Sequence, residues 1–444
     1  MSASLLERAA DIAARLELDR VPEHVVVHAG HVVTDTVGVA RGGGWSREIS
    51  RLVALDTAEG LVHKAGEPGS APWATSTVLS GDLPRTSAAH AALLNATAGT
   101  FLEMDEGMRP TGHPGMHVVP AALAVAQRVH ATGPELLRAV LAGYETTSRL
   151  FLGFRLRYPA HPHGHFGAVG AAVAVALLEN VDPVAAARVA GTTPLLSVWD
   201  ACYEGATTRN TWTGLAAQAG VRAAALVRAG FTGSARTLEV GFGSIAGDLV
   251  DPGAVTAALD YSQLGITRNY FKLHSACALT HAAIDAVGEM PLGPPADILR
   301  VRVETVSNNM KLDRQAQPNQ LSTRFSLPYA VAAAITLGRS DPDAFTYRPN
   351  VAALAERVDV SVAADLEARW PESSPARVSV ESVDGTVSRT VENPVGHHSR
   401  PISAEELRAK FSGLVGSEHA ELWWHTLTGL ADVPNCAEIL LGTP

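Results

Sequence analysis

The spacing of apolar residues changes near residue 296, and this change constrains the fold more than any other feature of the chain. Up to about residue 265, apolar residues recur at helical spacing, in segments that glycine and proline separate. These segments span residues 5–16, 86–102, 118–132, 134–152, 166–180 and 210–229. Alanine is abundant among them, and small side chains let helices pack closely. The first half therefore predicts an all-helical domain.

Beyond residue 296, apolar and polar residues alternate, which predicts half-buried strands. The strands are expected at residues 298–306, 358–362, 378–380 and 387–391, with a helical stretch at 326–337 among them. The dipeptide Asp384-Gly385 is typical of a hairpin turn. This region predicts a smaller α+β domain.

Helical spacing returns at residues 403–413, where Ser403 and Glu406 match a capping box. We therefore expect a mainly α protein in which an α+β domain interrupts a large all-helical domain. The helical domain would be formed by both chain ends, 1–265 and 396–444, and the insertion would span 266–395.

The composition allows a large core and restricts the partners. Of 444 residues, 46% are hydrophobic and 18% are charged, as in a folded protein of about two domains. The net charge of −10 argues against a nucleic-acid partner and against an anionic membrane surface. No apolar run approaches the length that spans a bilayer. An anionic substrate would need a locally positive pocket.

The cysteines and the N-terminus predict a cytoplasmic protein. Cys202, Cys277 and Cys436 are widely spaced and form no CxxC pair, which favours a reducing compartment. The first 20 residues carry charges throughout and lack the apolar run of a secretory signal.

An acidic segment at residues 101–114 combines three carboxylates with a histidine. Glu103, Asp105 and Glu106 follow an apolar helix, and His113 lies on the Gly/Pro loop after them. A neighbouring carboxylate raises the pKa of a histidine and fixes its tautomer, so the segment has the groups needed for acid–base chemistry. On spacing alone, a solvated helix end followed by a turn is the preferred interpretation.

Three histidines alternate at His161, His163 and His165, just before an apolar helix. They could bind a metal, but no acidic or cysteine ligand pair lies near them in the sequence. Because helix N-termini favour anions, binding of a carboxylate is the better functional interpretation. Histidines of a surface loop are the alternative.

Cationic residues occur in two further segments. Lys272, His274 and Cys277 lie where the helical domain meets the insertion, and pockets form preferentially between domains. Lys272 would supply positive charge there, unless the segment is only a linker. Cys277 has no evident activating base, so we expect it to line or pack the site. Arg209 precedes a helix and could hold a carboxylate by two hydrogen bonds.

Taken in order along the chain, these segments resemble the MmgE/PrpD family, which includes 2-methylcitrate dehydratase, cis-aconitate decarboxylase and iminodisuccinate epimerase. The resemblance covers almost the whole chain. It is carried by Met104-Asp-Glu with Thr111-Gly-His-Pro, Gly143-Tyr-Glu with Arg149, His161-Pro162, Lys272 with Thr280-His-Ala-Ala-Ile-Asp285, Phe325-Ser-Leu-Pro-Tyr, and Asn393-Pro with Ser403-Ala-Glu-Glu-Leu.

The resemblance implies that the insertion is an α+β lid and that the protein is a homodimer. It also implies an active site between the domains that needs no metal and no other cofactor. The expected chemistry is removal of a proton next to a carboxylate of a small polycarboxylic acid. The catalytic residues it implies are His113, Glu103, Asp105 and Lys272. The substrate-binding residues expected are His161, His163, Arg209, Tyr144, His274 and Cys277.

The sequence departs from the family pattern at three positions in this expected site. Gly107 and His163 replace the usual threonines, and Arg209 replaces the usual lysine. We therefore expect a lyase, a dehydratase or decarboxylase of carboxylic acid metabolism, without assigning its substrate. An isomerase or epimerase of a dicarboxylic acid is the alternative, and a non-catalytic protein that binds small acids is the third possibility.

Overall fold

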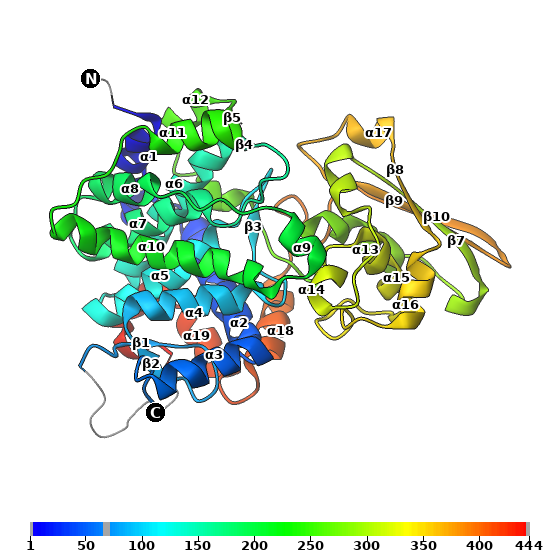
Figure 1. Cartoon of the computed structure of the whole chain (residues 1–444), viewed down its shortest axis with the longest axis horizontal. Helices are drawn as coiled ribbons and strands as arrows, with labels where there is room; N and C mark the ends of the chain where they lie inside the picture. The colour runs from blue at the N-terminus through cyan, green and yellow to red at the C-terminus, as the bar shows by residue number, and fades with distance from the viewer. Residues whose placement is uncertain (1–2, 65–71, 441–444) are drawn as a thin grey trace.

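The computed structural model describes residues 3–64 and 72–440, and its larger part is a body of packed helices (Figure 1). The predicted helices of the first half are present, and the fold is mainly α. The body contains α1 (Leu5–Ala14), α2 (Glu23–Gly43), α3 (Arg47–Ala58), α4 (Ala88–Thr100), α5 (Pro114–Val129), α6 (Gly133–Gly153), α7 (His165–Leu178), α8 (Pro183–Thr192), α10 (Thr211–Arg228), α11 (Thr237–Val240) and α12 (Pro252–Thr256). Two short ladders, β1 (Ser76–Thr77) with β2 (Arg85–Thr86) and β4 (Phe154–Leu156) with β5 (Gly247–Leu249), lie at its edges.

Helix α7 lies at the centre of this body because its surface is apolar on all sides. It packs against α5, α6, α8 and α10, and all its residues from His165 to Ala176 are buried. Small residues allow the close crossing with α6: a β-carbon on Gly143 would lie 2.6 Å from the carbonyl oxygen of Gly170. The alanine- and glycine-rich sequence therefore gives tight helix packing, as predicted.

The C-terminal helices return to the body. Helices α18 (Ala404–Val415) and α19 (Ala420–Thr428) both pack on α2, and Phe411 and Trp423 enter the same core as the N-terminal helices. The predicted capping box at the start of α18 is confirmed, since Ser403 accepts from the Glu406 amide and Glu406 accepts from the Ser403 amide.

The predicted strands form a four-stranded sheet in the order β10-β9-β7-β8. Strand β7 (Ile298–Thr305) pairs in parallel with β8 (Val358–Val362) and antiparallel with β9 (Ala376–Ser382). The hairpin predicted at Asp384-Gly385 joins β9 to β10 (Gly385–Val391). The accompanying helices are α13 (His281–Gly288), α14 (Gln320–Thr323), α15 (Leu327–Leu337), α16 (Pro349–Ala355) and α17 (Ala364–Glu367).

The body and this α+β part, the lid, have separate main cores. The core of the lid takes its apolar residues from the chain between Ala276 and Val391, with one addition: Trp199, Cys202 and Tyr203, in and before α9 (Asp200–Glu204), pack into it as well. We keep the division at residues 265 and 395 as a proposal. Within the described residues, no helix is long and apolar enough to cross a membrane.

One short ladder connects the two expected site segments. Strand β3 (Gly107–Met108) pairs with β6 (Asn269–Tyr270), so the loop that carries His113 lies beside the segment that carries Lys272. Figure 1 shows β3 on the side of the helical body that faces the lid.

Candidate active site

Three buried carboxylates follow helix α4, which ends at Thr100. Glu103 has a φ of +51°, a left-handed conformation that costs energy in a residue other than glycine and that recurs at functional sites. Asp105 and Glu106 follow it directly before β3. On spacing alone, the sequence favoured a solvated helix end here, and that interpretation is wrong. The structure instead removes all three side chains from solvent, so each needs a partner inside the protein.

Lys272 and Arg209 are the partners of the first two carboxylates. The Nζ atom of Lys272 lies 3.1 Å from Oε2 of Glu103 and 3.2 Å from Oδ1 of Asp105. Arg209 Nη2 lies 2.6 Å from Oε1 of Glu103. Burial alone would lower the pKa of Lys272, but the two carboxylates outweigh it and raise that pKa. Two cations and two anions thus balance each other in the buried cluster.

His113 lies at the start of helix α5 and has one engaged ring nitrogen. Its Nδ1 atom is 2.8 Å from the carbonyl oxygen of Glu106 and 2.9 Å from Oδ2 of Asp105. Both neighbours are acceptors, so we infer that Nδ1 carries the hydrogen. Within the described residues, Nε2 bonds to no protein group, and it is the nitrogen that can accept a proton.

Glu106 fixes the loop on which His113 lies. Its Oε1 accepts from the amide of Gly115 at 2.6 Å, and its Oε2 accepts from the Tyr144 hydroxyl at 2.8 Å and from Asn269 Nδ2 at 3.3 Å. Burial raises the pKa of Glu106 to about 7 despite these donors. Tyr144, expected to bind substrate, therefore acts here on the carboxylate that anchors the loop.

The predicted histidines of the 161–165 segment lie against His113. The ring of His163 is 4.6 Å from the rings of both His113 and His161, edge to face, and its Nε2 is 3.8 Å from Oδ2 of Asp105. Both nitrogens of His163 are buried without a hydrogen-bond partner among the described residues. Burial and the charge of Arg209 hold the pKa of His161 and of His163 well below the usual range, so both rings are neutral near pH 7.

One group in the described residues has possible metal ligands close together. Atoms of Asp105, His113 and His163 all lie within 4.8 Å of one another. However, both oxygens of Asp105 already face other groups, the ammonium of Lys272 and Nδ1 of His113. A second cation at this carboxylate would meet the fixed charge of Lys272. The donor set therefore fits a metal poorly, and metal independence stays a prediction.

Two further expected residues differ in their placement. Cys277 is buried at the same junction, and burial raises the pKa of its thiol to about 11, which fits a packing role rather than a nucleophile. His274 lies apart from the cluster. Its Nδ1 is 2.6 Å from Ser340 Oγ and its Nε2 is 2.9 Å from Asp285, so its contacts are with the lid.

Sequence reasoning missed Tyr270, whose side chain explains one departure from the family pattern. A β-carbon on Gly107 would lie 2.3 Å from Oη and 2.5 Å from Cζ of Tyr270. The phenol thus fills the space into which a threonine at position 107 would extend. Tyr270 lies two residues before Lys272, and this position was the only signal in the sequence, because its contact with Gly107 appears only in the fold.

Arg324, from the lid, is a second residue that the sequence analysis did not select. Its Nη1 donates to the carbonyl of Phe101 at 2.6 Å and so ties the lid to the acidic segment. Burial lowers the pKa of Arg324 to about 10, although Glu103 opposes this shift.

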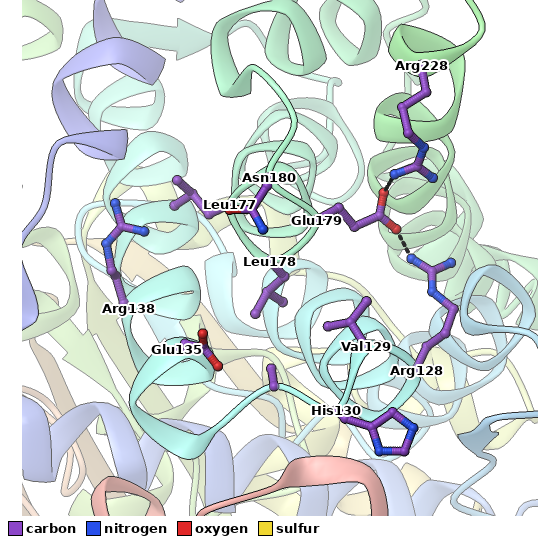
Figure 2. A pocket seen from close by; sticks show the side chains of 11 residues that line it. Arg128, Val129, His130, Glu135, Arg138, Leu177, Leu178, Glu179, Asn180 and Arg228 are labelled. Atoms are coloured by element: carbon purple, nitrogen blue, oxygen red, sulfur yellow. Dashed lines mark hydrogen bonds and ion pairs between the residues drawn. The ribbon is translucent and has the colours of Figure 1, made fainter.

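A pocket of about 630 Å³ opens elsewhere, between the ends of the body helices (Figure 2). Glu179 lies between Arg128 and Arg228 and forms ion pairs with both. None of the expected site residues contributes to its wall, which consists of Arg128, Val129, His130, Ala131, Glu135, Arg138, Leu177, Leu178, Glu179, Asn180 and Arg228. Since the expected site residues gather elsewhere, we place the candidate site at the buried cluster.

Comparison with known proteins matches both parts of the chain to one family. The MmgE/PrpD N-terminal domain matches residues 7–251, and the MmgE/PrpD C-terminal domain matches residues 274–421. Human cis-aconitate decarboxylase is 24% identical, and the match covers 98% of this chain and 94% of that protein. The mouse cis-aconitate decarboxylase is 23% identical, over 93% of this chain and 86% of that protein.

Proposed function

Because the chain belongs to the MmgE/PrpD family, we propose that it is a lyase that acts on a small polycarboxylic acid, by proton transfer at the carbon next to a carboxylate. The two relatives named above are decarboxylases of such an acid, cis-aconitate. At 23–24% identity these relatives support the type of reaction. The substrate of this chain must be argued from its own site.

The observation that carries the proposal is the orientation of His113. Its Nδ1 hydrogen faces Asp105 and the Glu106 carbonyl, so the neutral ring presents Nε2 as a base. When Nε2 takes the α-proton, the carboxylate of Asp105 stabilises the imidazolium that forms. Lys272 and Arg209 hold Asp105 ionised: burial would raise its pKa, but Lys272, His113 and Arg209 keep it well below the usual range.

Lys272 is placed to stabilise the charge that develops on the substrate. An ammonium group has three donors, and those directed at Glu103 and Asp105 leave one for a carboxylate oxygen of the substrate. Removing an α-proton moves negative charge onto that oxygen as an enediolate forms. A fixed cation in a site without bulk water stabilises this charge strongly. His161 assists by donating a hydrogen bond to the substrate from Nε2. This nitrogen carries the hydrogen because Nδ1 accepts from the His163 amide.

Two outcomes follow from this arrangement, and both are lyase reactions. In dehydration, His113 takes the α-proton, and the β-hydroxyl leaves as water with a proton that the imidazolium returns. In decarboxylation, Nε2 of His113 first takes a proton from the solvent. The carboxylate leaves as carbon dioxide, and the electron pair that remains on carbon takes that proton, which returns the ring to its neutral form.

An epimerase is the alternative, and Tyr270 is the residue that favours it. Epimerisation needs a second acid that returns a proton to the opposite face of the carbon. The Tyr270 hydroxyl lies next to Gly107, and Gly107 belongs to the loop that carries His113. The ring centroids of Tyr270 and His113 are 6.4 Å apart. Tyr270 is the candidate for that acid. Burial raises the pKa of its phenol, which therefore keeps its proton near pH 7.

The test is incubation of the purified protein in D₂O with cis-aconitate, 2-methylcitrate, citrate and a chiral dicarboxylic acid, followed by proton NMR. We expect an alkene or decarboxylated product from at least one tricarboxylate, and no product with His113→Asn. Appearance of only the opposite stereoisomer would replace the lyase by the epimerase. Binding without product or deuterium exchange would replace both by the non-catalytic acid-binding protein.

We also propose that the enzyme is a cytoplasmic homodimer that uses no cofactor, as the family resemblance implies. Light scattering after size-exclusion chromatography measures the mass directly. A mass of one chain, 46.5 kDa, at micromolar concentration would overturn the dimer.

A further inference from the structure

The two cations of the candidate site are already paired, which leaves the charge of a polycarboxylate unmatched. Lys272 and Arg209 are within 3.2 Å of Glu103 or Asp105, so the cluster carries two positive and two negative charges. A substrate with two or three carboxylates brings at least two further negative charges into this buried region. Burying them without added cations would be costly. A cation without a carboxylate partner should therefore lie nearby.

Arg109 is such a cation. It is 4% exposed, its Nε is buried without a hydrogen-bond partner, and no described Asp or Glu forms an ion pair with it. Its guanidinium carbon lies 4.7 Å from the centre of the Tyr270 ring, which compensates the buried charge only in part. Burial accordingly lowers the pKa of Arg109.

Two further unpartnered donors lie beside Arg109. The Arg109 amide donates to the Arg268 carbonyl at 3.2 Å, which extends the ladder between β3 and β6. The Phe271 amide donates to the Gly396 carbonyl at 2.9 Å, and this bond brings His397 to the same edge. Nε of Arg268 and Nε2 of His397 are buried without a partner among the described residues. Burial and the charges of Arg109, His398 and Arg268 lower the pKa of His397 to about 3, so its ring is neutral.

The ring of Tyr270 connects this group of donors to the proton-transfer site. Arg109 stacks on that ring, and the ring of His113 lies edge to face with it at 6.4 Å. Arg109 and His113 also belong to the same seven-residue loop, Gly107 to His113. An anion bound by Arg109 would thus lie beside the Tyr270 ring, which also contacts the ring of His113.

We propose that Arg109, Arg268 and His397 form an anion subsite that binds a carboxylate of the substrate remote from the reacting carbon, and so select polycarboxylic acids over monocarboxylic ones. The inference rests on the proposed function for the identity of the ligand. Its physical basis is the set of unpartnered donors: two guanidinium groups and one imidazole, gathered by backbone pairing, none of which forms an ion pair with a described carboxylate.

The test is calorimetric binding of tricarballylate, an unreactive tricarboxylate, to the native protein and to Arg109→Gln. We expect the affinity to fall on the order of tenfold, the usual scale for loss of one charged hydrogen bond. Arg109→Lys should recover part of it. Arg41→Gln is the matched control, since Arg41 is also 4% exposed and also stacks on an aromatic ring, that of Trp45 at 4.3 Å.

Several results would overturn the subsite. The first is that the native protein does not bind tricarballylate. The second is that Arg109→Gln binds it with unchanged affinity. The third is that Arg41→Gln loses as much affinity for it as Arg109→Gln does. Sulfate that binds through Arg109 without displacing tricarballylate would reveal an effector site instead.

Because binding needs no turnover, the proposed lyase function and the proposed subsite can fail separately. An inactive protein that binds tricarballylate through Arg109 would refute only the lyase. Turnover with unchanged KM in Arg109→Gln would refute only the subsite.

Discussion

The Nδ1 atom of His113 lies 2.9 Å from Oδ2 of Asp105, a carboxylate that is completely buried. His113→Asn keeps a donor toward Asp105 but removes the nitrogen that can accept a proton. We expect the variant to fold and its turnover to fall at least about a hundredfold, the scale for one acid–base group. His90→Asn is the control, because His90 pairs with Asp56 at 2.8 Å away from the site. Near-normal turnover in folded His113→Asn would remove His113 from the mechanism.

Replacing Lys272 tests whether the buried charges depend on one another. Lys272→Met leaves Asp105 and Glu103 short of a cation, so we expect a loss of about 3–5 kcal/mol in the free energy of unfolding and weaker substrate binding. Adding Asp105→Asn should recover part of the stability. Arg209→Met should also weaken binding.

Arg149→Met is the control for Lys272→Met, since Arg149 forms a buried ion pair with Glu145 at 2.7 Å. It should lower stability without changing the affinity of the folded protein for substrate. If Lys272→Met were as stable as the native protein, the inference that the buried charges depend on one another would be wrong.

The contact of Gly107 with Tyr270 predicts a compensating pair of substitutions. Gly107→Thr places a side chain where Oη of Tyr270 already lies, so we expect a loss of about 1–3 kcal/mol by overpacking. Tyr270→Ala should remove most of that penalty when the two are combined. The measurement is a double-mutant cycle of urea unfolding. Additive losses would show that the two side chains do not compete for space.

Glu106 should make stability depend on pH. Its pKa is about 7 in the folded protein and ordinarily 4.5, so the folded state binds more protons between these pH values. Stability should therefore fall as pH rises from 4.5 to 7, by on the order of 3 kcal/mol, and stay lower above pH 7. Glu106→Gln should lack this decrease. Equal pH dependence of urea unfolding in both proteins would place the titration on another group.

Metal removal tests the grouping of Asp105, His113 and His163. Because Lys272 already places a cation at Asp105, we expect full activity after exhaustive EDTA treatment and no stoichiometric metal in the purified protein. Activity that is lost with chelator and restored by one particular metal would overturn this. The three residues would then be the first ligands to examine.

The sequence predicted the elements of the fold well, because their signals are local. Periodicity placed helices and strands, and Ser403 with Glu406 identified the start of α18. The packing of the α9 segment was harder to predict. Trp199 and Tyr203 precede the insertion in sequence but pack into the core of the lid, and no local pattern reports which core an apolar residue enters.

The candidate site was only partly predictable, for a physical reason. Residue types singled out His113, Asp105 and Lys272, but their pairing depends on contacts across more than 150 residues. Lys272 and Arg209 were expected as free cations for the substrate, whereas folding pairs both with carboxylates. Arg109 was overlooked because an arginine in a polar loop looks solvated, and only its burial shows otherwise.

The ladder between β3 and β6 affects how a protein of this kind can diverge. It fixes the loop of His113 to the segment of Lys272, and Phe271, next to that ladder, is anchored in the core of the helical body. The distance between base and cation is therefore set without the sheet of the lid and the helices packed on it. Mutations in that sheet and those helices can alter the fit of a new acid while the proton-transfer geometry is inherited intact, so selection can act on substrate choice and on chemistry separately.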